Sequence, residues 1–178
     1  LNKGITLATG EVIGFLHSDD LFSHAKIISQ IAAVLQENKL DIIYGDLDYV
    51  KRDKVNTVVR HWQAGVYSRD KLKSGWMPPH PSFYARRELY QKTGGFDLSY
   101  RIAADYDCML KMLNNDDIKV YYLPKVFVKM RLGGESNRSI ANIIHKSSED
   151  YRILKSNNVG GFGALLCKNL RKIPQFII

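Results

Sequence analysis

The sequence predicts one α/β domain in which helices flank a central sheet, and three observations lead to this prediction. Two short apolar runs, residues 12–16 and 42–44, are each followed closely by carboxylates, as expected for buried strands that end at polar turns. A stretch with apolar residues at helical spacing, residues 23–38, lies between the two runs. The chain has 178 residues, which is enough for one hydrophobic core.

The composition is that of an ordinary globular protein, with 45% hydrophobic and 25% charged residues. No apolar run approaches the roughly 20 residues that a membrane-spanning helix needs, and no signal-peptide pattern opens the chain. Cys108 and Cys167 lie far apart among apolar neighbours, so we expect two free, buried thiols and a cytoplasmic protein.

The formal net charge of +8 is concentrated in three segments, residues 51–54, 86–87 and 168–172. Basic patches favour polyanions, anionic membrane surfaces or phosphorylated substrates. None of the usual nucleic-acid recognition motifs is present, so no nucleic-acid partner is expected.

The first third of the chain alternates between helical and strand patterns. Gly10 follows the first helical stretch at a typical C-terminal cap position. The expected elements are a helix over 2–8, a strand through 15, a helix that begins at 23 or 24 and ends at 38, a strand over 41–46, and an antiparallel pair, 47–50 and 57–62, around a polar turn.

The middle of the chain, residues 66–81, is expected to be irregular because no regular element accommodates Gly75 to Pro81. The expected later elements are a strand over 82–85, a helix over 87–93 closed by two glycines, a helix over 105–113, strands over 120–123 and 126–130, and a helix over 139–156 before a basic and apolar tail, 159–178. No repeat or linker divides the chain, so we expect a single domain.

Ser18, Asp19 and Asp20 directly follow the first predicted strand, where ligands bind in open α/β sheets. Adjacent carboxylates repel each other unless a cation lies between them. Their hard oxygen ligands suit Mg²⁺ or Mn²⁺ shared with substrate phosphates. The same three residues fit a helix N-cap before Leu21 equally well. Taken alone, this segment is compatible with both interpretations.

Two groups of motifs resemble family 2 glycosyltransferases with the GT-A fold. Residues 2–5, 8–11 and 15–20 (Asn-Lys-Gly-Ile, Ala-Thr-Gly-Glu and Phe-Leu-His-Ser-Asp-Asp) resemble the family's metal-site segment. Residues 94–97 and 103–107 (Gly-Gly-Phe-Asp and Ala-Ala-Asp-Tyr-Asp) resemble its acceptor-side segment. The order and spacing of these blocks match the family over nearly the whole chain.

The resemblance implies a mixed, Rossmann-like GT-A sheet flanked by helices, without the opening units that hold the nucleotide base. It divides the domain into a metal and donor side (1–65), an acceptor and catalytic part (66–138) and a helical tail (139–178). Residues 130–136 resemble a loop of bacterial members that build cell-surface polysaccharides.

The implied activity is sugar transfer, with inversion, from a nucleotide-diphosphate donor to a saccharide or lipid-linked acceptor in cell-envelope polysaccharide synthesis. Mg²⁺ or Mn²⁺ would neutralise the leaving diphosphate. By the resemblance Asp19 is the metal ligand and Asp20 supports it. His17 stands where an Asp is common and would contact the nucleotide, although it equally fits a polar residue at a strand end.

Asp105 occupies the family position of the base that removes the proton of the acceptor hydroxyl. It also fits the first turn of a helix, where a carboxylate is favoured by the helix dipole. These two roles are compatible, because a helix start is a rigid support for a catalytic group. Asp107 is the second candidate, but helical spacing turns it to a different face.

Four further residues are candidates for the cleft. His80, between two prolines, would lie near the donor diphosphate or the acceptor, or pack within its loop. Trp76 would stack on a sugar face or belong to the core. Asp46, at the end of the second predicted strand, would be a polar group of the cleft or would form a turn. Arg131, with the glycines that follow it, would close over the diphosphate or form a surface turn.

The tail, residues 162–178, mixes large apolar residues with cations, a pattern that suits either a helix in a membrane interface or a packed terminal helix. Membrane contact would bring the site to a lipid-linked acceptor at the anionic cytoplasmic leaflet. Two rival functions remain. A nucleotidyltransferase would need a basic glycine-rich loop near the N-terminus, and a non-catalytic basic module would bind a membrane or nucleic acid.

Overall fold

The computed structural model describes residues 1–132 and 140–171, and it contains one mixed sheet. Its strand order is β1-β5-β3-β6-β2, and β4 pairs with β3 outside this path. β3 and β6 run parallel, and all other pairs are antiparallel. The strands are β1 (Val12–Gly14), β2 (Leu21–Phe22), β3 (Ile42–Lys51), β4 (Lys54–Trp62), β5 (Phe83–Arg86) and β6 (Val120–Arg131).

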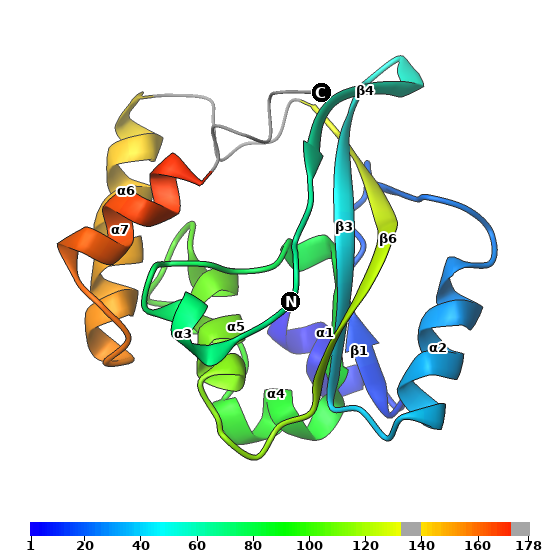
Figure 1. Ribbon diagram of the computed structural model, residues 1–178, viewed down its shortest axis with the longest axis horizontal. Coiled ribbons are helices and arrows are strands. Elements are labelled where there is room, and N and C mark those ends of the chain that lie inside the picture. Colours follow the sequence, from blue (N-terminus) through cyan, green and yellow to red (C-terminus); the bar gives the residue numbers. More distant parts are fainter. Residues whose placement is uncertain (133–139, 172–178) are drawn as a thin grey trace.

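Helices cover both faces of this sheet. Figure 1 shows α2 on one side of the sheet, with α3, α5, α6 and α7 on the other. The helices are α1 (Asn2–Leu7), α2 (Ile27–Glu37), α3 (Arg69–Leu72), α4 (Arg87–Thr93), α5 (Ala104–Leu113), α6 (Ile140–Ser156) and α7 (Phe162–Leu170), with one 3₁₀ turn, η1 (His80–Ser82). None of the described helices is both long and apolar enough to cross a membrane.

Alternating residues of β3 build two separate cores, because successive side chains of a strand point to opposite faces. Ile43 and Leu47 pack with the buried face of α2, whereas Ile42 and Tyr44 pack with α4 and α5. The second core is the larger, and the candidate site lies on its side of the sheet.

Two strand boundaries differ from those expected. The strands expected over 41–46 and 47–50 are one strand, β3, and those expected over 120–123 and 126–130 are one strand, β6, despite Pro124. The pairing passes from Tyr44–Tyr122 to Asp46–Val126, so three residues of β6 oppose Gly45. This bulge explains how the sheet accommodates a proline, which has no N–H to donate to the ladder.

The alternative interpretation of Ser18–Asp20 as a helix N-cap is wrong. Leu21 and Phe22 form β2, which pairs with β6, and α2 begins only at Ile27 without a side-chain cap. The two carboxylates therefore lie in a loop between strands. Other corrections are smaller. The region 66–81 contains α3 and part of η1, and Cys167 is exposed, although Cys108 is a free, buried thiol as expected.

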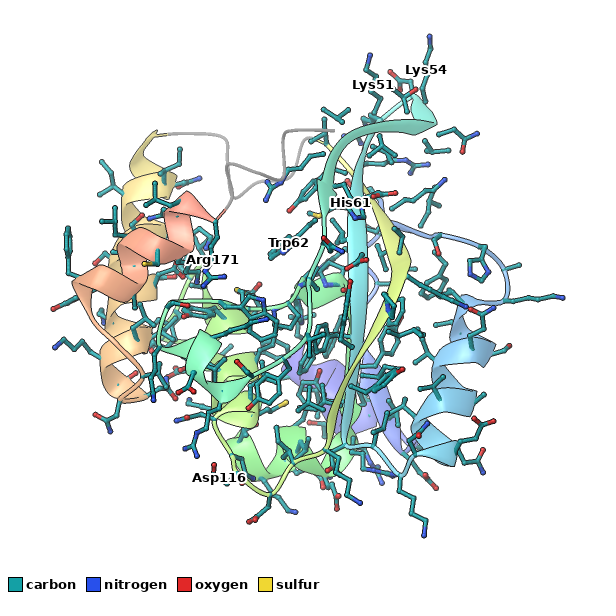
Figure 2. All side chains as sticks on the ribbon, in the orientation of Figure 1. Lys51, Lys54, His61, Trp62, Asp116 and Arg171 are labelled. Atoms are coloured by element: carbon teal, nitrogen blue, oxygen red, sulfur yellow. The ribbon has the colours of Figure 1, made fainter. Side chains whose placement is uncertain are left out.

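The helix over 87–93 is confirmed as α4, and Gly94 ends it in the left-handed region with φ 79°. The antiparallel pair 47–50 and 57–62 is also confirmed within β3 and β4. Its basic turn projects from the sheet, and Figure 2 shows Lys51 and Lys54 pointing outward at its tip.

Candidate active site

A cavity of about 560 Å³ lies between the β3–β4 wall of the sheet and the helices α6 and α7. His17, His80 and Asp105 line it, although they come from three distant segments. Figure 2 shows Trp62 and Arg171 on opposite sides of the same space, and both residues line the cavity. The structure therefore brings together the expected metal-side and acceptor-side segments.

Asp105 lies in the first turn of α5 and is half-buried. Its Oδ1 accepts the backbone N–H of Tyr106 at 2.8 Å. The carboxylate thus belongs to the helix start and lines the cavity at the same time. Asp107 points elsewhere, because it is buried and forms an ion pair with Lys111 at 2.6 Å.

His80 connects the two sides of the cavity. Its ring centroid lies 6.0 Å from that of His17, and Phe15 and Phe96 pack beside it at 5.5 and 5.6 Å. Burial lowers the pKa of His80, although the nearby Asp105 carboxylate opposes this shift. Its buried Nε2 has no hydrogen-bond partner among the described residues. His80 thus lines the cavity and holds a buried ring nitrogen without a partner among the described residues.

The expected metal ligands Asp19 and Asp20 do not line the cavity, although His17 of the same segment does. Asp20 is 6% exposed, and its Oδ2 has no hydrogen-bond partner in the part of the chain that is described. Burial raises the pKa of the Asp20 carboxyl, although His17 opposes this change. Burial also raises the pKa of the cavity residue Tyr49, and the negative charges of Asp20 and Asp105 add to this rise.

Arg131 joins β6 to this metal segment. Its Nη1 donates to the main-chain oxygen of Asp19 at 3.2 Å, and the side chain is not among those that line the cavity. The glycines at 133–134, which were expected to act with Arg131, lie outside the described residues.

The described residues contain no group of three or more His, Cys, Asp or Glu side chains placed to hold a metal ion. The adjacent carboxylates Asp19 and Asp20, one with an unpaired buried oxygen, nevertheless fit a hard cation. Mg²⁺ commonly uses only one or two protein carboxylates and takes its other ligands from water and substrate phosphates. The fit is therefore to a shared cation rather than to a closed protein site.

Trp76 belongs both to the core and to the cavity wall. Its Nε1 donates to the carbonyl of Ala64 at 2.9 Å, and its ring packs against Tyr44 at 5.8 Å. Asp46 is structural, because its buried carboxylate accepts the N–H of Ala64 and the hydroxyl of Tyr122 at 2.8 and 2.9 Å. It does not line the cavity.

Glu149 on α6 is an important residue that sequence reasoning missed. Its buried carboxylate accepts three consecutive backbone N–H groups, those of Arg101, Ile102 and Ala103, at 2.7, 2.9 and 2.8 Å. Burial alone would raise the pKa of Glu149, but these donors lower it below the ordinary value. This contact holds the loop immediately before α5, and thereby the position of Asp105.

Lys168 on α7 is the second missed residue. Its Nζ pairs with Asp150 at 2.8 Å, and both side chains are buried. The same Nζ lies 2.9 Å from the ring centroid of Tyr106, next to Asp105 in the chain. Burial lowers the pKa of Lys168 to about 7, although Asp150 opposes the shift. The described part of the expected tail is thus packed on the domain. Residues 172–178 lie outside the described residues.

Comparison with known proteins agrees with this geometry. Residues 1–105 match the family model described as glycosyl transferase family 2. PGL/p-HBAD biosynthesis glycosyltransferases of Mycobacterium tuberculosis and Mycobacterium bovis are 29% identical over 139 residues, which cover 77% of this chain and 52% of theirs. An uncharacterized glycosyltransferase of Mycobacterium tuberculosis is 30% identical over 115 residues, 62% of this chain and 42% of its own.

The chain thus spans about half the length of the curated relatives that it matches. Among solved structures, Staphylococcus aureus TarS 1–349 in complex with UDP-GlcNAc superposes with a TM-score of 0.61 at 18% identity, covering 89% of this chain and 44% of TarS. This likeness confirms the GT-A-like mixed sheet with flanking helices. The chain belongs to glycosyl transferase family 2.

Proposed function

We propose that the protein transfers a sugar from a nucleotide-diphosphate donor to a hydroxyl of a saccharide or lipid-linked acceptor, with inversion at the anomeric carbon. The observation that carries this proposal is the shared cavity of His17, His80 and Asp105. The UDP and UDP-GlcNAc complexes of TarS, which has the same fold, support a nucleotide-sugar donor.

Asp105 acts as the base in this proposal. The acceptor oxygen forms a bond to the anomeric carbon while the bond from that carbon to the diphosphate oxygen breaks, and the hydroxyl proton passes to the Asp105 carboxylate. The start of α5 and the Glu149 contacts hold this carboxylate in place. His80 supplies a neutral donor or acceptor beside it, and Trp76 offers an aromatic wall for a sugar ring.

Asp19 would hold a divalent cation with the help of Asp20, and such an ion supplies charge neutralisation to a leaving diphosphate. His17 would contact the nucleotide or its phosphates. Arg131 holds the main chain of this segment and would support it from β6. In this scheme residues 1–65 form the donor side, residues 66–138 the acceptor side, and residues 139–178 a helical tail.

The surface of α7 supports a peripheral membrane contact at the inner face of the plasma membrane. Phe162, Leu166 and Leu170 recur at intervals of four residues and are 74%, 52% and 53% exposed. Such an exposed apolar face suits the boundary of a bilayer. The names of the mycobacterial relatives, which refer to PGL/p-HBAD biosynthesis, are compatible with a role in the cell envelope.

The test measures nucleotide release from a panel of UDP- and GDP-sugars with Mn²⁺, using the complete protein. Asp105→Asn and Asp19→Ala should each lower turnover by about 100-fold or more and leave the fold intact. The control is Glu88→Gln, an exposed carboxylate on α4. Full turnover in both site variants would contradict the assignment. Salt-sensitive polyanion binding without turnover would favour a non-catalytic module.

A further inference from the structure

Four cationic side chains, Lys71, Lys146, Lys168 and Arg171, line the active-site cavity together with Asp105. We call these four residues the cationic wall. They come from α3, α6 and α7 with its C-terminal cap, on the side of the cavity opposite the strands β3 and β4.

Close packing holds the cationic wall in position. Gly75 has φ +70°, and a Cβ built there would lie 2.6 Å from the carbonyl oxygen of Ala164 and 2.7 Å from the Cβ of Lys168. Beside it, Arg171 donates to the hydroxyl of Ser74 at 2.8 Å. Helix α7 is therefore seated directly on the loop that follows α3, and its cations belong to the body of the domain.

The cationic wall carries excess positive charge, even though burial lowers the pKa of one member, Lys168, to about 7. Lys146 and Lys168 share one carboxylate, that of Asp150, at 3.3 and 2.8 Å. Lys71 donates to the carbonyl oxygen of Val66, a neutral group. Among the described residues that line the cavity, Asp105 is the single carboxylate. Like charges in a cleft with low-dielectric walls focus the field and attract an oppositely charged ligand.

The cationic wall shares no residue with the proposed metal site. Asp19, Asp20 and Arg131 do not line this cavity, although His17 of the same segment does. The four cations lie across the cavity from Tyr49. An anion held there would share the cavity with Asp105, on the wall opposite β3 and β4.

We propose that the cationic wall binds a phosphate group of the acceptor and thereby selects acceptors that carry a phosphate near the reacting hydroxyl. This inference rests on the proposed function, because it takes Asp105 as the base. Ammonium and guanidinium groups bind phosphate through charge-assisted hydrogen bonds. The selected substrates are therefore phosphorylated saccharides or phosphate-linked lipids.

The two tryptophans of the chain, Trp62 and Trp76, both line the cavity, so intrinsic fluorescence reports on a ligand bound there. Inorganic phosphate is titrated at constant ionic strength, and we expect a saturable fluorescence change. Lys146→Gln and Arg171→Gln should each weaken phosphate binding about tenfold, the loss of one charge-assisted contact. Lys155→Gln is the matched control, because Lys155 is an exposed residue of the same helix α6.

UDP distinguishes the two sources of a bound phosphate. If the cationic wall serves the acceptor, saturating UDP leaves the phosphate affinity unchanged. Competitive displacement of phosphate by UDP would assign these cations to the donor diphosphate and overturn the proposal. A linear, non-saturating response, or equal binding by Lys146→Gln and the control, would also overturn it.

A different experimental result would refute the proposed function. Unchanged turnover in Asp105→Asn refutes the base assignment, whereas phosphate binding to the cationic wall is measured without turnover. The two failures are therefore distinguishable. Far-ultraviolet circular dichroism of each variant is the check that the fold is preserved.

Discussion

Replacing Glu149 with Gln tests whether α6 positions the loop that precedes Asp105. The carboxylate accepts three backbone N–H groups at 2.7 to 2.9 Å, one on Oε1 and two on Oε2. Gln retains one acceptor oxygen but places an NH₂ group against the remaining N–H donors. Since a hydrogen bond to a charged group contributes about 1.5–3 kcal/mol, the substitution should lower the free energy of unfolding by about 2–3 kcal/mol.

Urea denaturation at pH 7 measures this loss as a lower midpoint with an unchanged slope. Turnover should fall about 10- to 100-fold, because a small displacement of a catalytic group has an effect of that order. Donor affinity should not change, since the metal segment does not contact Glu149. The control Glu88→Gln, on the surface of α4, should shift stability by less than about 0.5 kcal/mol.

The pH dependence of stability gives an independent check. The native pKa of Glu149 lies below its ordinary value, so the native state favours the charged form. Its stabilisation is complete above the unfolded pKa of about 4.3 and is lost as the pH falls through the lowered native pKa. The difference in stability between the parent and Glu149→Gln should therefore shrink under acid conditions. Equal stability of the two proteins at pH 7 would refute the reasoning.

Four further substitutions test the site and its support. Gly75→Ala should destabilise by about 1–3 kcal/mol in thermal unfolding, because of its positive φ and the contact with α7, whereas Gly163→Ala, in open space on α7, should stabilise by about 0.5–1 kcal/mol. Asp20→Asn should raise the Mn²⁺ concentration for half-maximal turnover about tenfold, and an unchanged metal requirement would remove Asp20 from the metal site. Lys168→Met leaves Asp150 with Lys146 alone, so thermal unfolding should show a loss of about 3 kcal/mol; an unchanged melting temperature would contradict the importance of the buried pair.

Local signals in the sequence were sufficient for several elements. Apolar residues at helical spacing indicated α2, and Gly94 marked the end of α4. The two motifs around Asp19 and Asp105 indicated the family, and the family match over residues 1–105 shows it. These features depend on residues close together in the chain, so one sequence carries the information.

Long-range pairing decided what the sequence left open. Strand β2 exists because Leu21 and Phe22 pair with Lys129 and Val128, more than one hundred residues away. This pairing excluded the helix cap that Ser18 to Asp20 had suggested. The two strands expected on either side of Pro124 form one strand, β6. Pro124 fits because it lies in the bulge opposite Gly45, where residues 123–125 have no pairing partners in β3.

The candidate site divides in the same way. The sequence by itself identified His17, His80 and Asp105 as polar residues in suitable motifs, and the tertiary structure placed them in one cavity. The sequence alone could not identify Glu149 or Lys168, because a charged residue on a helix is usually solvated and nothing nearby in the chain marks these two as buried. Only the docking of α6 and α7 against α5 supplies their partners, since the desolvation of a charge is compensated by groups that the fold brings from elsewhere.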